Sequence, residues 1–171
     1  PVFAGVFHYV DNDFNKAISP LQRAIQLNPK DAQAHFYLAM THEGLARPAE
    51  ALTHYEKSLA LADSADTRVA FARLLFSLGR YAESQQQVDR ARTIDPTSRD
   101  AAYESGRLAY ERGDWERAAA AGERALALAG MGTTDRQIDY LLGRAYGKLR
   151  QQERARKHLT LFKASGASLR R

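Results

Sequence analysis

The sequence predicts an all-α protein built from about five helix-turn-helix repeats, and three observations support this prediction. Similar segments at 17–29, 51–63, 84–96 and 118–130 begin 34, 33 and 34 residues apart. Ala, Leu, Arg, Glu and Gln, all strong helix formers, dominate these segments. Their apolar residues recur at spacings of three and four, which places them on one face of a helix. A regular period of this length is typical of stacked supersecondary units.

Each of these segments is the second helix of a repeat, because a turn signal and another helical stretch precede it. The turn signals are DNDF (11–14), LARP (45–48), LGRY (78–81) and RGDW (112–115). A fifth repeat contains LLGRAYGKL (141–149) and follows a loop about three residues longer than the period allows. We therefore expect one array with repeats at approximately 1–29, 30–63, 64–96, 97–130 and 133–164, followed by a flexible basic tail at 165–171.

Small residues occupy fixed places in these helices. Two helices approach closely only where side chains are short. We therefore expect the helices of each pair to meet at these positions, which are Gly5, Ala17, Ala39, Ala51, Ala72, Gly106, Ala118, Gly143 and Ala155.

The recurring phrases of the chain resemble the tetratricopeptide repeat (TPR) family over residues 1 to about 164. They are LGRAY (142–146), GDWERA (113–118), ALTHYEKSLAL (51–61) and LNP (27–29). The resemblance implies a right-handed α-α superhelix, a TPR solenoid, in which the first helix of each repeat lines a concave groove. It also implies that ligands lie along this groove.

Composition excludes several classes of protein. The chain has 171 residues and no cysteine, so it has no disulfide framework, thiolate metal site or cysteine nucleophile. No apolar run approaches about 18 residues, and the first residues do not form a signal peptide, so we expect no membrane span. Arginine outnumbers lysine 19 to 6, which suggests a bacterial chain. The sequence does not distinguish a cytoplasmic from a periplasmic location.

Positive charge is concentrated at the C-terminal end. Residues 144–171 hold nine basic residues and one acid, a net charge of +8, whereas residues 1–143 carry −3. This end is either a solvated surface or an electrostatic contact for an acidic protein, an anionic lipid or nucleic acid. We do not expect nucleic-acid binding, because the repeats lack the paired residues that read one base each.

No catalytic or metal-binding constellation is expected. His42-Glu43 begins like a zinc-protease motif, but Ala46 stands where the second histidine belongs. We interpret the histidines at 8, 35, 42, 54 and 158 as packing residues, and we expect no metal, no cofactor and no enzyme activity within these residues.

The candidate peptide-binding groove follows from the repeat register. Arg73, Arg107 and Arg144 occupy the same slot in three successive repeats, with aromatic residues one turn away. The corresponding positions of the first two repeats are apolar and aromatic. Arginine and aromatic residues are enriched at binding hot spots. The candidate groove residues are Phe36, Tyr37, Met40, Arg73, Phe76, Tyr103, Arg107, Tyr110, Tyr140 and Arg144.

Each groove feature also has a purely structural interpretation. Glu104 and Glu111 could pair with Arg107 and cancel its charge, and the arginines would then be ordinary surface residues. Phe36 and Tyr37 could instead fill the gap between the first two repeats.

We therefore predict a non-catalytic scaffold that binds a protein or peptide partner with an apolar anchor and an acidic segment. Two alternatives stay open: a substrate-presenting or regulatory module of a larger enzyme, and self-association through uncapped ends. Because no polar helix closes the array, we expect the chain to be an excerpt of a longer protein.

Overall fold

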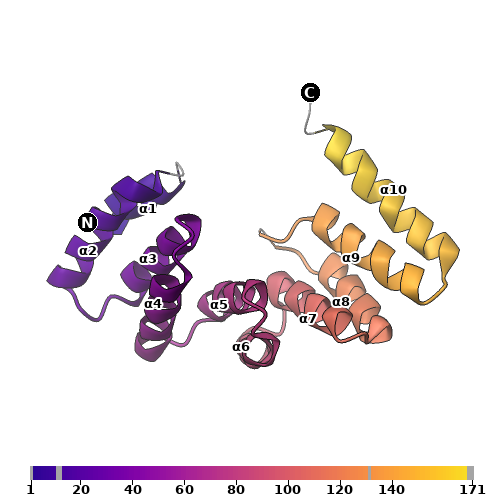
Figure 1. Cartoon of the computed structure of the whole chain (residues 1–171), viewed down its shortest axis with the longest axis horizontal. Coiled ribbons are helices and arrows are strands. Elements are labelled where there is room, and N and C mark those ends of the chain that lie inside the picture. The colour runs from indigo at the N-terminus through magenta and orange to yellow at the C-terminus, as the bar shows by residue number, and fades with distance from the viewer. Residues whose placement is uncertain (1, 11–12, 131, 169–171) are drawn as a thin grey trace. The chain divides into compact units, whose positions relative to one another are not determined.

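The computed structural model describes residues 2–10, 13–130 and 132–168, and these residues form ten α-helices and no strand (Figure 1). The all-α prediction is therefore confirmed. The helices are α1 (Val2–Val10), α2 (Phe14–Leu27), α3 (Ala32–Gly44), α4 (Pro48–Leu61), α5 (Ala65–Ser77), α6 (Tyr81–Ile94), α7 (Arg99–Glu111), α8 (Trp115–Ala127), α9 (Asp135–Lys148) and α10 (Gln152–Ser168).

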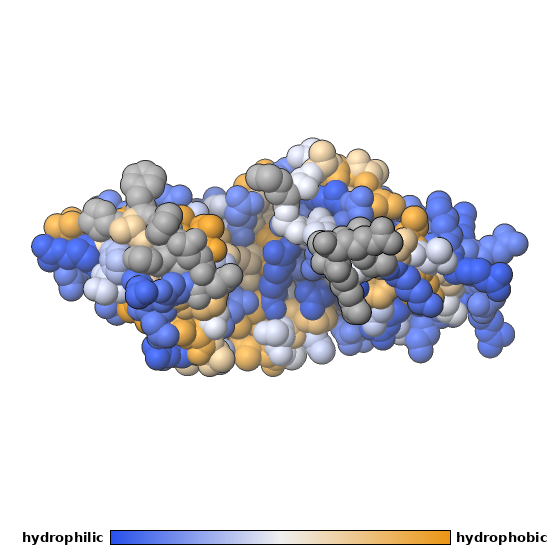
Figure 2. Space-filling model, turned by 90° about the horizontal axis from the view of Figure 1, so that it is seen from above, coloured by the Kyte–Doolittle hydropathy of each residue, from blue (hydrophilic) through white to orange (hydrophobic). Residues whose placement is uncertain are grey.

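The chain divides into two compact units, an N-terminal unit (Pro1–Arg80) and a C-terminal unit (Tyr81–Arg171). In the N-terminal unit, Ala39 of α3 and Ala51 of α4 are fully buried around Tyr55, whose ring stacks on Phe71 with centroids 5.6 Å apart. The core of the C-terminal unit is formed by α7, α8, α9 and α10. On the face seen in Figure 2, hydrophobic and hydrophilic residues are interspersed.

Small residues bring the helices of the C-terminal unit together as expected. A Cβ atom added to Gly143 on α9 would lie 2.7 Å from the side chain of Leu159 on α10. One added to Gly106 on α7 would lie 2.8 Å from Leu141 Cδ2 and 3.3 Å from the carbonyl oxygen of Ala118. Since real Cβ contacts are longer, a larger residue at either position would require the neighbouring leucine side chain to shift.

Four turns between paired helices place one residue in the left-handed region at the same point of the repeat. These residues are Ala46 (φ 55°), Gly79 (φ 72°), Gly113 (φ 79°) and Arg150 (φ 59°). The first three lie inside turn signals of the sequence, and Arg150 directly follows LLGRAYGKL (141–149). They are 33, 34 and 37 residues apart, so they follow the period, and the last interval includes the inserted loop. Glycine adopts this conformation without strain, whereas alanine and arginine do not.

The inserted loop before α9 is fixed to α7. The backbone N–H of Thr133 donates a hydrogen bond to Asp100 Oδ1 at 2.6 Å, and Thr133 is buried. Thr134 and Gln137 then form a capping box that begins α9. Met131, which belongs to this loop, lies outside the described residues.

The last helix, α10, continues through residues 165–168, which the sequence assigns to a flexible tail. Residues 169–171 lie outside the described part of the chain. Among the described helices, none combines the length and apolar character that crossing a bilayer requires.

Candidate functional site

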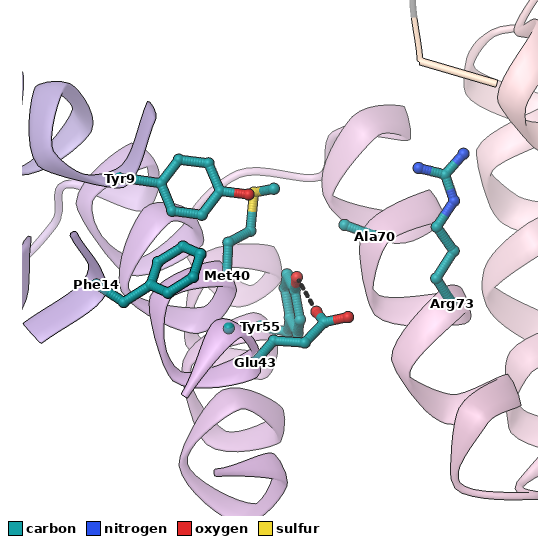
Figure 3. A pocket seen from close by; sticks show the side chains of 8 residues that line it. Tyr9, Phe14, Met40, Glu43, Tyr55, Ala70 and Arg73 are labelled. Atoms are coloured by element: carbon teal, nitrogen blue, oxygen red, sulfur yellow. Dashed lines mark hydrogen bonds between the residues drawn. The ribbon is translucent and has the colours of Figure 1, made fainter. Parts of the chain in front are cut away.

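A pocket of about 370 Å³ lies in the N-terminal unit (Figure 3). Two of the expected groove residues, Met40 and Arg73, line it together with Tyr9, Phe14, Gly44, Glu43, Tyr55 and Ala70. In Figure 3 the rings of Tyr9 and Phe14 and the thioether of Met40 lie on one side, with the Arg73 side chain across from them. The pocket therefore offers an apolar surface beside a guanidinium group.

One acidic side chain in this pocket is held by a buried tyrosine. The Tyr55 hydroxyl donates a hydrogen bond to Glu43 Oε2 at 2.9 Å, and Tyr55 is fully buried. Burial raises the pKa of Glu43, while this hydrogen bond and the charge of Arg73 act in the opposite direction. Burial is also the largest cause of the raised pKa of Tyr9, and the charge of Glu43 adds to it. The pocket is thus a mixed environment rather than a purely apolar one.

Phe36 and Tyr37 belong to a different pocket of the same unit. This second pocket, of about 300 Å³, is also lined by Ser58 and Thr67. Tyr37 packs on Tyr9 with ring centroids 6.0 Å apart, and Phe36 packs on Tyr55 at 6.2 Å. Tyr37 thus packs against a ring of the first repeat, whereas Phe36 packs against a ring of its own repeat. Both are half-buried, and both also line a pocket. Phe76, on α5, is partly buried.

In the C-terminal unit, three expected groove residues form one contact. The guanidinium carbon of Arg144 lies 4.4 Å from the ring centroid of Tyr110 and 5.5 Å from that of Tyr140. Arg144 and Tyr140 are exposed, whereas Tyr110 is buried. Within the described part of the chain, Arg144 forms no ion pair with an acidic side chain. Its cation is thus held by two aromatic rings and stays available to a ligand.

This contact continues in both directions as an aromatic–cation row. Tyr110 packs on Trp115 at 4.8 Å, and Lys148 Nζ lies 5.5 Å from the Trp115 ring. Tyr140 packs on Phe162 at 5.0 Å, and the Arg136 guanidinium lies 4.3 Å from the Phe162 ring. The row consists of Lys148, Trp115, Tyr110, Arg144, Tyr140, Phe162 and Arg136.

Four members of this row, Arg136, Lys148, Trp115 and Phe162, are not among the groove residues predicted from the sequence, although the chain carries a signal for the first two. Arg136, Tyr140, Arg144 and Lys148 are spaced by four residues along α9, so they share one helix face. Trp115 and Phe162 come from α8 and α10 and have no such local signal.

Arg107 differs from Arg144. Its Nη1 donates to Glu104 Oε2 at 2.8 Å, and Glu104 is 1% exposed. Arg107 also lies over the Tyr103 ring at 5.9 Å. The pairing with Glu104 that the structural interpretation anticipates is present, so the Arg107 guanidinium is bound to a buried carboxylate. Arg73 belongs to the N-terminal unit, where it lines the pocket of about 370 Å³.

The histidines pack between helices. His54 of α4 stacks on both His35 and His42 of α3, with ring centroids 5.2 and 5.6 Å apart. His158 of α10 is buried against Asp139, with Nδ1 2.8 Å from Oδ1. Across residues 2–10, 13–130 and 132–168, no group of three or more His, Asp or Glu side chains is arranged to hold a metal ion. The side chain of His8 lies outside the described residues.

Paired helices with a repeated turn and small residues at fixed positions define an α-helical repeat protein. The chain belongs to the tetratricopeptide repeat family, because residues 8–66 and 69–130 match the sequence profile of that family. No match is found among curated protein sequences. Members of the family are in general non-catalytic scaffolds that bind protein partners.

Solved structures agree with this assignment. The chain is similar to PilF of Pseudomonas aeruginosa, with a TM-score of 0.85 and 22% identity over 95% of this chain and 73% of that one. It is similar to a thermophilic TPR protein of Thermus thermophilus, with a TM-score of 0.73 and 20% identity over 99% and 97%. It is also similar to MamA, with a TM-score of 0.75 and 20% identity over 93% and 90%. At these identities the likeness shows the fold.

Proposed function

We propose that this chain is a non-catalytic scaffold that binds a polypeptide segment on the faces formed by the first helices of its repeats. The observation that carries the proposal is the position of Arg144 between Tyr110 and Tyr140. An exposed guanidinium with two aromatic contacts is positioned before any ligand arrives. Little rotamer entropy is then lost when it binds.

The geometry of Arg144 favours a carboxylate. The guanidinium carbon lies 4.4 and 5.5 Å from the two ring centroids, and no acidic side chain of the described residues pairs with its N–H groups, which remain for hydrogen bonding. Two parallel N–H···O bonds from such an edge match the spacing of a carboxylate. An aspartate, a glutamate or a terminal carboxylate of the partner would bind here, beside the exposed ring of Tyr140.

The N-terminal unit supplies a site for an apolar side chain. Tyr9, Phe14 and Met40 line its 370 Å³ pocket, and methionine adapts its shape to different ligands. Arg73 at the same pocket adds a cation. A partner that carries an apolar anchor would place it here, and acidic residues would bind at Arg144.

Selection from a random peptide library displayed on phage tests this proposal. We expect wild-type protein to enrich peptides that contain acidic residues. A selected peptide, labelled with a fluorophore, should bind Arg144→Gln about tenfold or more weakly, because charge-assisted hydrogen bonds are lost.

Arg156→Gln is the matched control. Arg156 is exposed on α10, outside the aromatic–cation row, and its replacement changes the net charge by the same amount. An equal loss of affinity in both variants, or the enrichment of no acidic sequence, would contradict the proposal. Unchanged helical content in both variants, measured by circular dichroism, shows that folding is retained.

A further inference from the structure

A second positively charged surface lies in the C-terminal unit, on another side of α7. Two adjoining pockets of about 520 and 300 Å³ share Arg92, Ser105 and Arg117. Arg112 lines the first pocket and Arg124 lines the second. We call these two pockets together the arginine groove.

The arginine groove is separate from the face that carries Tyr103, Arg107 and Tyr110. Successive residues of an α-helix are about 100° apart around its axis. Ser105 therefore lies roughly 200° from Tyr103 around α7. A ligand in the arginine groove and a ligand at Arg144 would contact different sides of this helix.

The groove is lined by arginines and by small residues. Arg92 comes from α6, Arg112 follows α7, and Arg117 and Arg124 belong to α8; all four are exposed. The small residues that line the two pockets are Ala102, Ser105, Ala109, Ala120 and Ala121. Small side chains allow another backbone to approach closely, as they do between the helices of this fold.

The acids at the groove are already engaged. Asp89 Oδ1 accepts a hydrogen bond from Gln85 Nε2 at 2.8 Å. Asp114 caps α8 by accepting from the backbone N–H of Arg117 at 3.1 Å, and its second oxygen lies 3.4 Å from Arg117 Nε. These acids hold local structure and leave the cations in excess.

The four arginines differ in their engagement. Arg124 Nη2 donates to the carbonyl oxygen of Pro96 at 2.7 Å, which fixes its position. Arg92 and Arg112 form no ion pair with any described residue. Arg117 and Arg124 thus each have one contact within the chain, whereas Arg92 and Arg112 are open to a ligand.

We propose that the arginine groove binds an acidic helical segment of a protein partner. Arg117 and Arg124 are seven residues apart on α8, so they are separated by two turns, about 10.5 Å. Carboxylates at positions i and i+7 of a partner helix have the same separation. The small lining residues accept the backbone of such a helix, and the arginines pair with its carboxylates.

The residues that line the groove favour a protein ligand over nucleic acid. No aromatic side chain is among the described residues that line either pocket. Binding of single-stranded nucleic acid depends on aromatic rings that stack on the bases, in addition to cations that contact the phosphates. The described residues of the groove supply the cations but no aromatic ring.

Fluorescence anisotropy with a designed probe tests the proposal. The probe is an alanine-based peptide of about 20 residues, long enough to form a helix in water, with glutamates on one face at i, i+3 and i+7. Its counterpart carries glutamine at the same places. We expect the glutamate peptide to bind at least about tenfold more tightly than the glutamine peptide.

Matched variants locate the binding. Arg92→Gln/Arg112→Gln should weaken binding of the glutamate peptide about tenfold or more. Arg156→Gln/Lys157→Gln, which removes the same charge from the exposed surface of α10, should leave it unchanged. Arg144→Gln should also leave it unchanged, so this test is independent of the proposed peptide site at Arg144.

Three results would overturn the proposal. The first is equal binding of the glutamate and glutamine peptides. The second is an equal loss of affinity in Arg92→Gln/Arg112→Gln and in Arg156→Gln/Lys157→Gln. The third is displacement of the glutamate peptide by oligothymidylate at a lower concentration than by unlabelled peptide.

Discussion

His35 Nδ1 lies 3.0 Å from His54 Nδ1, so a hydrogen bond between them requires that one of these nitrogens carry no proton. His54 also stacks on His42 with an interplanar angle of 7°. Burial lowers the pKa of all three histidines, and that of His54 falls to about 4 because the charges of His35, His42 and Lys57 add to the effect of burial.

These pKa values predict that acidification destabilises the protein. The folded state binds fewer protons than the unfolded state, whose histidines titrate near pH 6.5. The contribution of His54 to the free energy of unfolding is therefore fully present above pH 6.5, and it is lost as the pH falls toward 4. We expect the melting temperature to fall across this range, measured by circular dichroism.

His54→Gln provides the comparison for this pH dependence. Glutamine does not titrate, so the melting temperature of the variant should decline less steeply between pH 6.5 and 4 than that of wild type. Glu43, whose raised pKa acts with the opposite sign, is present in both proteins and cancels in the comparison. Parallel slopes would exclude the histidine stack as the cause.

Left-handed turns predict two stabilising substitutions. Ala46→Gly and Arg150→Gly should each raise the free energy of unfolding by about 0.5–1 kcal/mol, because glycine relieves the strain of positive φ. Chemical denaturation measures the change. The reverse substitution, Gly79→Ala, should lower stability by a similar amount, since a Cβ atom there meets no atom within 4 Å and only the backbone is strained.

Helix α9 contains two glycines with opposite expected behaviour. Gly143→Ala should lower the free energy of unfolding by about 1–3 kcal/mol, because the added Cβ would lie 2.7 Å from Leu159. Gly147 is exposed with no atom near its Cβ position, so Gly147→Ala should raise stability by up to about 1 kcal/mol through helix propensity. If both substitutions act in the same direction, the close approach of α9 and α10 at Gly143 is not what constrains this position.

The buried pair of Asp139 and His158 predicts a non-additive effect. His158→Leu should lower the free energy of unfolding by about 3 kcal/mol, because it leaves the Asp139 carboxylate buried without its histidine. The double variant Asp139→Leu/His158→Leu should recover part of that loss. A double-mutant cycle by urea denaturation measures the coupling, and additive losses would argue against a paired role.

The fold could be predicted because its determinants are local and repeated. The period, the turn signals and the small residues at 106 and 143 are all visible along the chain. The pairing of Glu104 with Arg107 could also be anticipated, since residues three apart on a helix are neighbours. The burial of Glu104 could not be predicted, because it depends on the helices packed around α7.

The candidate sites were predicted in part for the same reason. Arg144 and Tyr140 share a face of α9, but the Trp115 and Phe162 rings that extend the row belong to α8 and α10. Similarly, His35 and His42 are visible as one face of α3, whereas His54 joins them only through the packing of α4. The arginine groove combines side chains of three helices, so it has no signature in any single segment.

The contact of Gly143 with Leu159 also bears on how such proteins diverge. PilF and MamA are 22% and 20% identical to this chain over the aligned residues and have a similar fold. A fold held by a few short side chains per repeat leaves most surface positions free to change without loss of structure. Binding at the two proposed sites, Arg144 and the arginine groove, would depend on exposed side chains that this architecture does not fix.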